Sequence, residues 1–143
     1  MEVINEGKET QEETLEILKT YVDGDVSGVI DIGSTGNIVN HSSVGMFVGA
    51  STSNLKFLDG FHDDLAMWSN ALSDSEVLAI YNSGSVLDIS SDSGNYASSS
   101  NLTGWWRMGD DDTLPTITDN SNNTNNGTTA NVSASDISTE VPS

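Results

Sequence analysis

The segment that decides the fold is FLDGFHDDLAMWSNALSDSEVLAIYNSG, residues 57–84. Within it, Phe61–Trp68 is typical of a strand that carries acidic side chains at its beginning. Ser73 and Glu76 then have the spacing of a capping box, in which each side chain accepts a hydrogen bond from the main-chain N–H of the other residue. The apolar residues that follow predict a short helix over about Asp74–Asn82.

The residues before this segment are typical of short strands joined by turns. From Tyr21 to Gly60, short apolar runs are separated by Gly, Ser or Asn, as in the strands of a sandwich. Asp23-Gly24 is a strong signal for a hairpin turn. Two alternatives remain for the chain before that turn: a helix over Glu9–Lys19, or a strand that runs from Leu15 into the turn.

The residues after the segment alternate between polar and strand-like stretches. Ser85–Ser100 has the composition of a polar linker, and Leu102–Met108 returns to strand character. From Gly109 onward the chain is rich in Asp, Asn and Thr, and Asn120–Asn131 is close to low complexity. This last part either lies along the sandwich as irregular loops, with a short strand near Gly127–Val132, or is mobile.

Composition and charge restrict the class of protein. The 143 residues allow one domain, or one domain with a tail, and 13 Gly among many Ser, Thr, Asn and Asp favour an all-β fold. A formal net charge of −18 would repel phosphate backbones and anionic membranes, so nucleic acid is not an expected partner. No run approaches the roughly 18 apolar residues that cross a bilayer, which predicts a soluble chain without membrane insertion. Without cysteines, neither disulfides nor thiolate metal sites can form.

Residues 57–84 resemble the closing motif of laminin-G-like, concanavalin-A-like jelly-roll domains. In that family a Gly, an Asp pair, a strand with an aromatic end, an Ala-Leu-Ser element and a short capped helix follow one another in this order. Tyr21–Gly24 (YVDG) resembles a hairpin of the same family, and Met46–Ala50 resembles the strand after it. The resemblance implies an antiparallel jelly-roll β-sandwich with one short helix.

A second part of the chain resembles the opening of such a domain, although it comes after the closing motif. It comprises Leu102–Asp110 (LTGWWRMGD) and the Asp-x-Ser-x-x-x-Asn-x-Gly-Thr pattern of Asp119–Thr128. The reversed order fits a piece of a tandem array, a circularly permuted sandwich, or strand exchange between copies in a homo-oligomer. Because opening and closing strands are antiparallel neighbours in the family, we expect Leu102–Met108 to lie beside Phe61–Trp68.

The resemblance also suggests how the chain is divided and where it acts. The Trp105–Asp110 stretch (WWRMGD) and the VPS ending are similar to units of virion or tail-associated proteins of marine bacteriophages, which implies an extracellular or virion location. The expected parts are an N-terminal extension (1–20), the closing part of the sandwich (21–84), a linker (85–101) and the opening part (102–143).

Acidic residues near both motifs form a candidate calcium site. Ca²⁺ takes six to eight oxygen ligands, and the resemblance would bring the two acidic stretches side by side. The alternative is that these acidic loops are only solvated. The expected ligands are Asp63, Asp64, Asp110 and Asp112, with Asp111 and Asp119 as further candidates.

The aromatic residues divide into candidates for binding and for packing. Trp105 and Trp106 are adjacent in a predicted strand, so their side chains point to opposite faces and we expect only one of them in the core. The other would be a sugar-stacking platform or an interface contact, which makes this pair the candidate ligand-binding residues. Phe61, Trp68 and Tyr96 are expected to pack, and Arg107 is expected to pair with nearby carboxylates.

Together these features predict a non-catalytic binding or adhesion module that recognises surface glycans or a protein partner. The alternative is a structural building block of a virion or surface array without a small ligand. A third hypothesis, a glycan-cleaving enzyme, needs two positioned carboxyl groups with separated pKa values. His41 and His62 lie in no recognisable catalytic motif, and we expect no enzyme activity.

Overall fold

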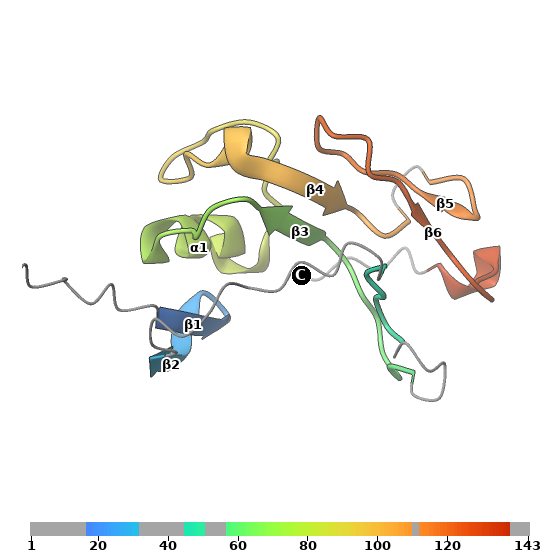
Figure 1. The fold of residues 1–143 in the computed structure, drawn as a ribbon, viewed down its shortest axis with the longest axis horizontal. Coiled ribbons are helices and arrows are strands. Elements are labelled where there is room, and N and C mark those ends of the chain that lie inside the picture. Colours follow the sequence, from blue (N-terminus) through green and yellow to red (C-terminus); the bar gives the residue numbers. More distant parts are fainter. Residues whose placement is uncertain (1–16, 32–44, 51–56, 110–111, 138–143) are drawn as a thin grey trace, which may run out of the picture.

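The computed structural model describes residues 17–31, 45–50, 57–109 and 112–137 (Figure 1). Within these residues the strands form three two-stranded antiparallel sheets, beside one α-helix and short 3-10 turns. The mostly-β expectation is confirmed, whereas the jelly-roll sandwich and its permuted order stay predictions. The elements are β1 (Ile17–Val22), β2 (Asp25–Asp31), β3 (Leu65–Trp68), α1 (Asp74–Tyr81), β4 (Leu102–Trp106), β5 (Thr116–Ile117) and β6 (Gly127–Thr128).

Strands β1 and β2 form a hairpin around the predicted Asp-Gly turn. Asp23 and Gly24 both have positive φ angles, 52° and 81°, which is the requirement of the type I′ turn that best matches the twist of paired strands. The chain before the turn was expected to be either a helix or a strand, and Ile17–Val22 is a strand. Residues 9–16, which carried the alternative helix, lie outside the described residues.

The hairpin is docked on helix α1 by polar contacts and by its turn. The Nζ of Lys19 and the hydroxyl of Tyr21 both donate to Oδ1 of Asp74, each at 2.6 Å. A Cβ atom at Gly24 would lie 2.7 Å from Cδ1 of Tyr81, so the close approach of the turn to the end of α1 requires glycine.

Helix α1 begins at the predicted capping box. The Ser73 hydroxyl accepts the Glu76 N–H at 3.3 Å, and the Glu76 carboxylate accepts the Ser73 N–H at 2.9 Å. The helix ends at Asn82, whose φ of 45° is the left-handed conformation of many helix C-termini. The predicted helix is confirmed within one residue. No helix in the described part of the chain is long and apolar enough to cross a membrane.

Strands β3 and β4 pair within the same chain and connect the two motif regions. Leu65 lies opposite Trp106 and Ala66 opposite Trp105, and the register shifts between Met67 and Trp68. The expected antiparallel neighbourhood of these strands is confirmed. In Figure 1 they lie at the centre of the molecule, between α1 and the β5–β6 pair.

The principal core lies between β4, α1 and the segment before β4. Ile89, Tyr96, Leu102 and Trp105 form its buried cluster, and Trp68 packs against it. Tyr96 is the most buried, with 1% of its surface exposed, and its hydroxyl accepts from Nε1 of Trp68 and donates to the carbonyl of Ile89. Residues 85–101, expected as a polar linker, are thus a folded loop that supplies core side chains. Tyr96 can be buried because its hydroxyl has both a hydrogen-bond donor and an acceptor within the core.

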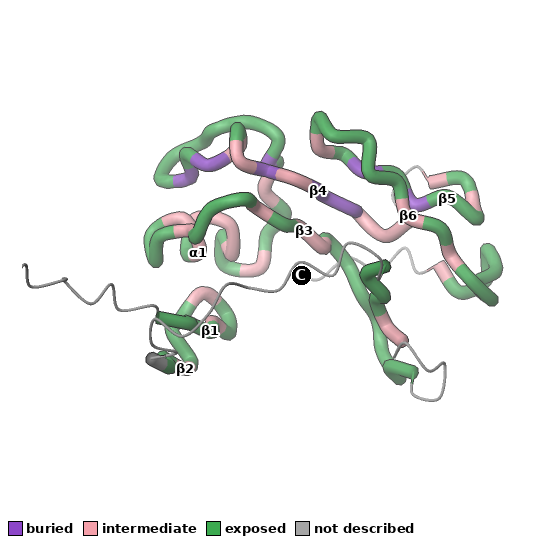
Figure 2. Tube along the Cα trace, in the orientation of Figure 1, coloured by how far each residue is buried: buried purple, intermediate pink, exposed green. Residues whose placement is uncertain are grey.

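Burial is confined to the second half of the described chain. No described residue before Ile89 is buried, as the tube in Figure 2 shows. In the hairpin, Leu18, Val22 and Ile30 are 50%, 60% and 57% exposed. Phe61 is 85% exposed, so its expected role in packing is wrong: the residues around it in the chain are exposed as well and offer it no core.

Candidate functional site

Two neighbouring hollows lie around the indole ring of Trp105. The first has a volume of about 420 Å³ and combines this buried ring with polar side chains of the surface. The second, of about 450 Å³, lies between residues 63–66, 84–87 and the end of α1, and Trp105 and Val86 line it as well. The first hollow is lined by Val86, Asp88, Ser90, Trp105, Arg107 and Asn120.

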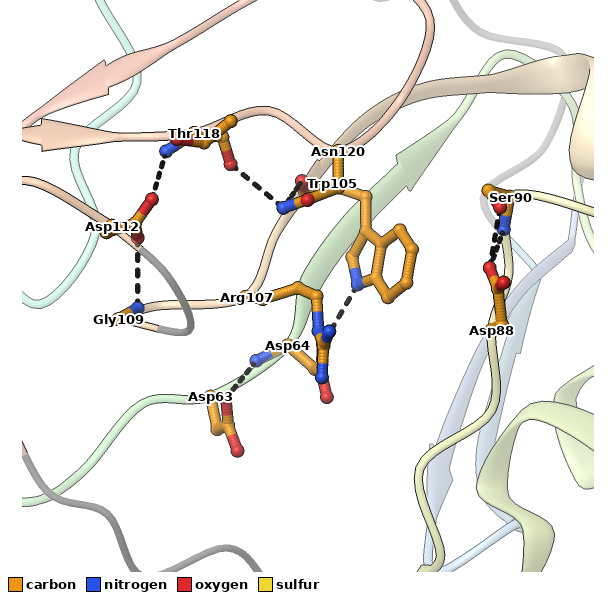
Figure 3. A network of polar contacts seen from close by, with 10 residues as sticks. All are labelled: Asp63, Asp64, Asp88, Ser90, Trp105, Arg107, Gly109, Asp112, Thr118 and Asn120. Atoms are coloured by element: carbon orange, nitrogen blue, oxygen red, sulfur yellow. Dashed lines mark hydrogen bonds and ion pairs between the residues drawn. The ribbon is translucent and has the colours of Figure 1, made fainter.

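Trp105, Asp64 and Arg107 form a polar cluster beside both hollows (Figure 3). Nε1 of Trp105 donates to Oδ1 of Asp64 at 2.9 Å, and Nε of Arg107 lies 3.7 Å from the same oxygen. The guanidinium carbon of Arg107 is 5.5 Å from the centre of the Trp105 ring, within the range of a cation–π contact. The expected pairing of Arg107 with a nearby carboxylate is confirmed, and the pair fixes the ring orientation.

The backbone at Asp64 is in a conformation that few residues other than glycine adopt. Its φ is 45°, and its main-chain N–H donates to the Asp63 carboxylate at 3.0 Å. Such left-handed residues cost free energy and persist only where the surroundings hold them. Here the hydrogen bond from Trp105 holds the Asp64 side chain.

Asp88 is held at the rim of the first hollow by Ser90. Its Oδ1 accepts both the Ser90 hydroxyl at 2.6 Å and the Ser90 N–H at 3.0 Å. These hydrogen bonds hold the pKa of Asp88 below its ordinary value, with a smaller contribution from the charge of Arg107, and they outweigh its slight desolvation. Within the described residues, Oδ2 of Asp88 accepts no hydrogen bond, so it remains an acceptor for a ligand.

Asn120 also lines the first hollow and carries a second acceptor oxygen. Its side-chain nitrogen donates to the carbonyl of Thr118 at 3.2 Å and to that of Trp105 at 3.5 Å. These bonds orient the amide, and its oxygen accepts no hydrogen bond from the described part of the chain. The site is therefore built from β4, from the loop before it and from the loop after β5.

Asp119 is a buried carboxylate that organises the loop after β5. It is 6% exposed and accepts four hydrogen bonds, from the main chain of Trp105, Ser121 and Asn125 and from the Ser121 hydroxyl. Burial acts to raise the pKa of Asp119, but the hydrogen bonds outweigh it and the net pKa is lowered. In the Asp-x-Ser-x-x-x-Asn motif, the Asp119 carboxylate therefore closes the loop by accepting hydrogen bonds from Ser121 and Asn125.

The candidate calcium ligands do not form a cluster among the described residues. Asp112 accepts the N–H groups of Gly109 and Thr118 at 3.0 and 2.8 Å, which closes another loop. The Asp64 carboxylate accepts a hydrogen bond from the indole N–H of Trp105. No group of three or more His, Asp or Glu suited to a metal ion occurs in the ranges that the structure describes. Asp110 and Asp111 lie outside those ranges, so the calcium site stays a prediction.

The two tryptophans are both buried, which corrects the expectation that only one would be. Trp105 and Trp106 are 6% and 9% exposed. Trp106 packs over Gly104, and its Nε1 donates to the carbonyl of Asn125 at 2.8 Å. The loop that Asp119 closes therefore covers the second face of β4. Of the two predicted ligand-binding residues, only Trp105 lines the hollows.

Sequence reasoning missed Asp88 and Asn120, which line the first hollow with Trp105. Asp88 lies in the segment expected to be a linker, and Asn120 lies in an Asn-rich stretch where no single residue stands out. The one local signal was the Asp-x-Ser spacing of Asp88 and Ser90, which permits the observed side-chain turn.

No family of proteins, no curated protein and no solved structure matches the chain. The resemblance to laminin-G-like domains therefore stays a prediction that depends on the sequence motifs alone, which are Tyr21–Gly24, Met46–Ala50, residues 57–84, Leu102–Asp110 and Asp119–Thr128.

Proposed function

We propose that the protein is a non-catalytic binding module that holds a glycan in the first hollow. The observation that carries this proposal is the joint lining of one hollow by Trp105, Asp88 and Asn120, with Arg107 beside them. An aromatic edge can contact the C–H groups of a sugar, while carboxylate and amide oxygens accept hydrogen bonds from its hydroxyls. Each of these side chains is held in place by other hydrogen bonds, so the site is formed before a ligand arrives.

The carboxylates at the hollow are suited to binding. A glycosidase needs one carboxylic acid whose raised pKa lets it donate a proton to the leaving group. The pKa of Asp88 is lowered instead, so this group is ionised at neutral pH and serves as an acceptor. Asp64 holds the Trp105 indole and Arg107 in place.

A glycan array followed by calorimetric titration of the strongest glycan tests the proposal. Asn120→Ala should weaken binding by about fivefold, since one well-made hydrogen bond contributes on the order of 1 kcal/mol. Asp59→Ala is the matched control, because Asp59 is an exposed residue outside both hollows. Equal affinities of the two variants for the glycan, or no glycan bound at all by the native chain, would contradict the proposal.

The exposed apolar hairpin favours a second candidate function, assembly with other protein chains. Leu18, Val22 and Ile30 are all at least half exposed, whereas two-stranded hairpins need further packing for stability. A building block of a larger particle would bury such a surface. Analytical ultracentrifugation of the native chain and of a Leu18→Ser/Ile30→Ser variant tests this candidate: a discrete oligomer that the substitutions dissociate supports it, and a native monomer opposes it.

A further inference from the structure

We infer that the first hollow selects uncharged, hydroxyl-rich glycans, and that Asp88 is the residue that rejects anionic ones. The inference rests on the proposed function and specifies its ligand. Sugars that carry uronate, sulfate or sialic acid groups are those that the site excludes.

The acceptor oxygens at the hollow favour a ligand that donates hydrogen bonds. Oδ2 of Asp88 and Oδ1 of Asn120 accept no hydrogen bond from the described residues. Hydroxyl groups can donate to both oxygens, whereas a carboxylate or sulfate group has only acceptors to offer. Two adjacent hydroxyls of one sugar ring are the simplest group that supplies such donors.

The charges around the hollow also favour an uncharged ligand over an anionic one. Arg107 is the cation that lines it, and its guanidinium already lies beside Asp64 and over the Trp105 ring. With the charge of Arg107 offset by Asp64, Asp88 leaves the surroundings negative, in a chain of formal net charge −18. An anionic group placed there would meet the charge of Asp88, while the charge of Arg107 is already shared between the two carboxylates of Asp64 and Asp88.

The position of Asp88 is fixed, which makes the selection depend on geometry as well as on charge. The two hydrogen bonds from Ser90 hold one carboxylate oxygen and so direct the other. An acceptor held in one orientation loses little conformational freedom when a hydroxyl binds. Ser90 is therefore a positioning residue for Asp88.

The experiment compares one array of neutral, uronate, sulfated and sialylated glycans across the native chain and two variants. The native chain should bind neutral glycans at least about tenfold more tightly than anionic analogues of the same linkage, a difference of about 1.4 kcal/mol. Asp88→Asn should reduce that preference by bringing anionic glycans closer in affinity. Ser90→Ala should weaken neutral binding while the rejection of anions persists, because the charge stays.

The outcomes separate this inference from the proposed function. Native binding to anionic glycans as tight as to neutral ones, or an unchanged preference in Asp88→Asn, overturns the inference and leaves glycan binding intact. Binding of no glycan on the array overturns both. A thermal unfolding curve of each variant shows that it is folded, and Asp59→Asn controls for the loss of one negative charge away from the hollow.

Discussion

The carboxylate of Asp119 accepts the main-chain N–H of Trp105 at 2.9 Å and so joins the loop after β5 to strand β4. The same side chain accepts the N–H groups of Ser121 and Asn125, at 2.9 and 2.8 Å. Because this loop covers Trp106 while Trp105 faces the principal core, one carboxylate connects the two buried regions.

Substitution of Asp119 by Asn should therefore destabilise the fold strongly. An amide keeps only one acceptor oxygen. Its NH₂ group would face either the N–H groups of Trp105 and Ser121 or the Asn125 N–H and the Ser121 hydroxyl, so at least one main-chain N–H loses its partner and meets a second donor. We expect the free energy of unfolding to fall by about 3 kcal/mol, measured by urea denaturation. Ser121→Ala, which removes only the hydroxyl, should cost about 1 kcal/mol. A loss in Asp119→Asn no larger than in Ser121→Ala would refute this role.

A methyl group at Gly104 should displace Trp106. A Cβ there would lie well inside van der Waals contact with Cη2 of the indole. Gly104→Ala should lower the free energy of unfolding by about 2 kcal/mol through overpacking and change the tryptophan fluorescence of the folded state. Gly45→Ala is the control, because a Cβ at Gly45 would have no atom of the described residues within 4 Å. Identical fluorescence and stability of the two variants would contradict the packing described.

Glu76 should contribute a pH-dependent part of the stability. Hydrogen bonds from the Ser98 hydroxyl, and then from Ser73 and Ala97, lower the pKa of Glu76 from 4.5 to about 2. Since the folded pKa lies below the unfolded one, this stabilisation is complete above about 4.5 and is lost as the pH falls toward 2.

In Glu76→Gln the difference from the native chain should therefore shrink across that window, as followed by urea midpoints at successive pH values. Asp59→Asn removes an exposed carboxylate that accepts no hydrogen bond from the described residues, so it controls for net charge. A gap between native and Glu76→Gln that stays constant down to about pH 2 would argue against the hydrogen bonds.

Tyr96 should stabilise the core through its hydroxyl. Burial raises the pKa of Tyr96, so the phenol stays protonated and can donate to the Ile89 carbonyl while it accepts from Trp68. Tyr96→Phe leaves both partners without this bond and should cost about 2 kcal/mol of unfolding free energy in urea denaturation. Tyr21→Phe, at an exposed hydrogen bond, should change stability by less than about 0.5 kcal/mol. Equal losses of unfolding free energy in Tyr96→Phe and Tyr21→Phe would contradict a stabilising role of the Tyr96 hydroxyl.

Two of the features that the sequence predicts correctly are set by residues close together in the chain. The Asp23-Gly24 turn needs only two residues that tolerate positive φ angles, and the Ser73–Glu76 box closes within one helical turn. The pairing of β3 with β4 was expected from the resemblance of two motifs to the opening and closing strands of another family, although the motifs are far apart in this chain.

The features that were missed depend on contacts between distant residues. Tyr96 is buried because Trp68 and Ile89 satisfy its hydroxyl, and a polar segment gives no sign of this. Trp106 is buried because a loop beyond β5 returns to cover it. For the same reason the sequence gives no sign that Asp88 lines a hollow with Trp105, because the fold brings the two residues together.

The absence of buried side chains before Ile89 among the described residues has a consequence for local opening. The hairpin can detach from α1 by losing exposed contacts at Asp74 and the packing at Gly24, while the core beneath β4 stays closed. Amide protons of β1 and β2 should then exchange with solvent deuterium far sooner than those of β4. We therefore expect local opening of the β1–β2 hairpin without opening of the core, and a partner that covers the hairpin should slow exchange in β1 and β2 alone.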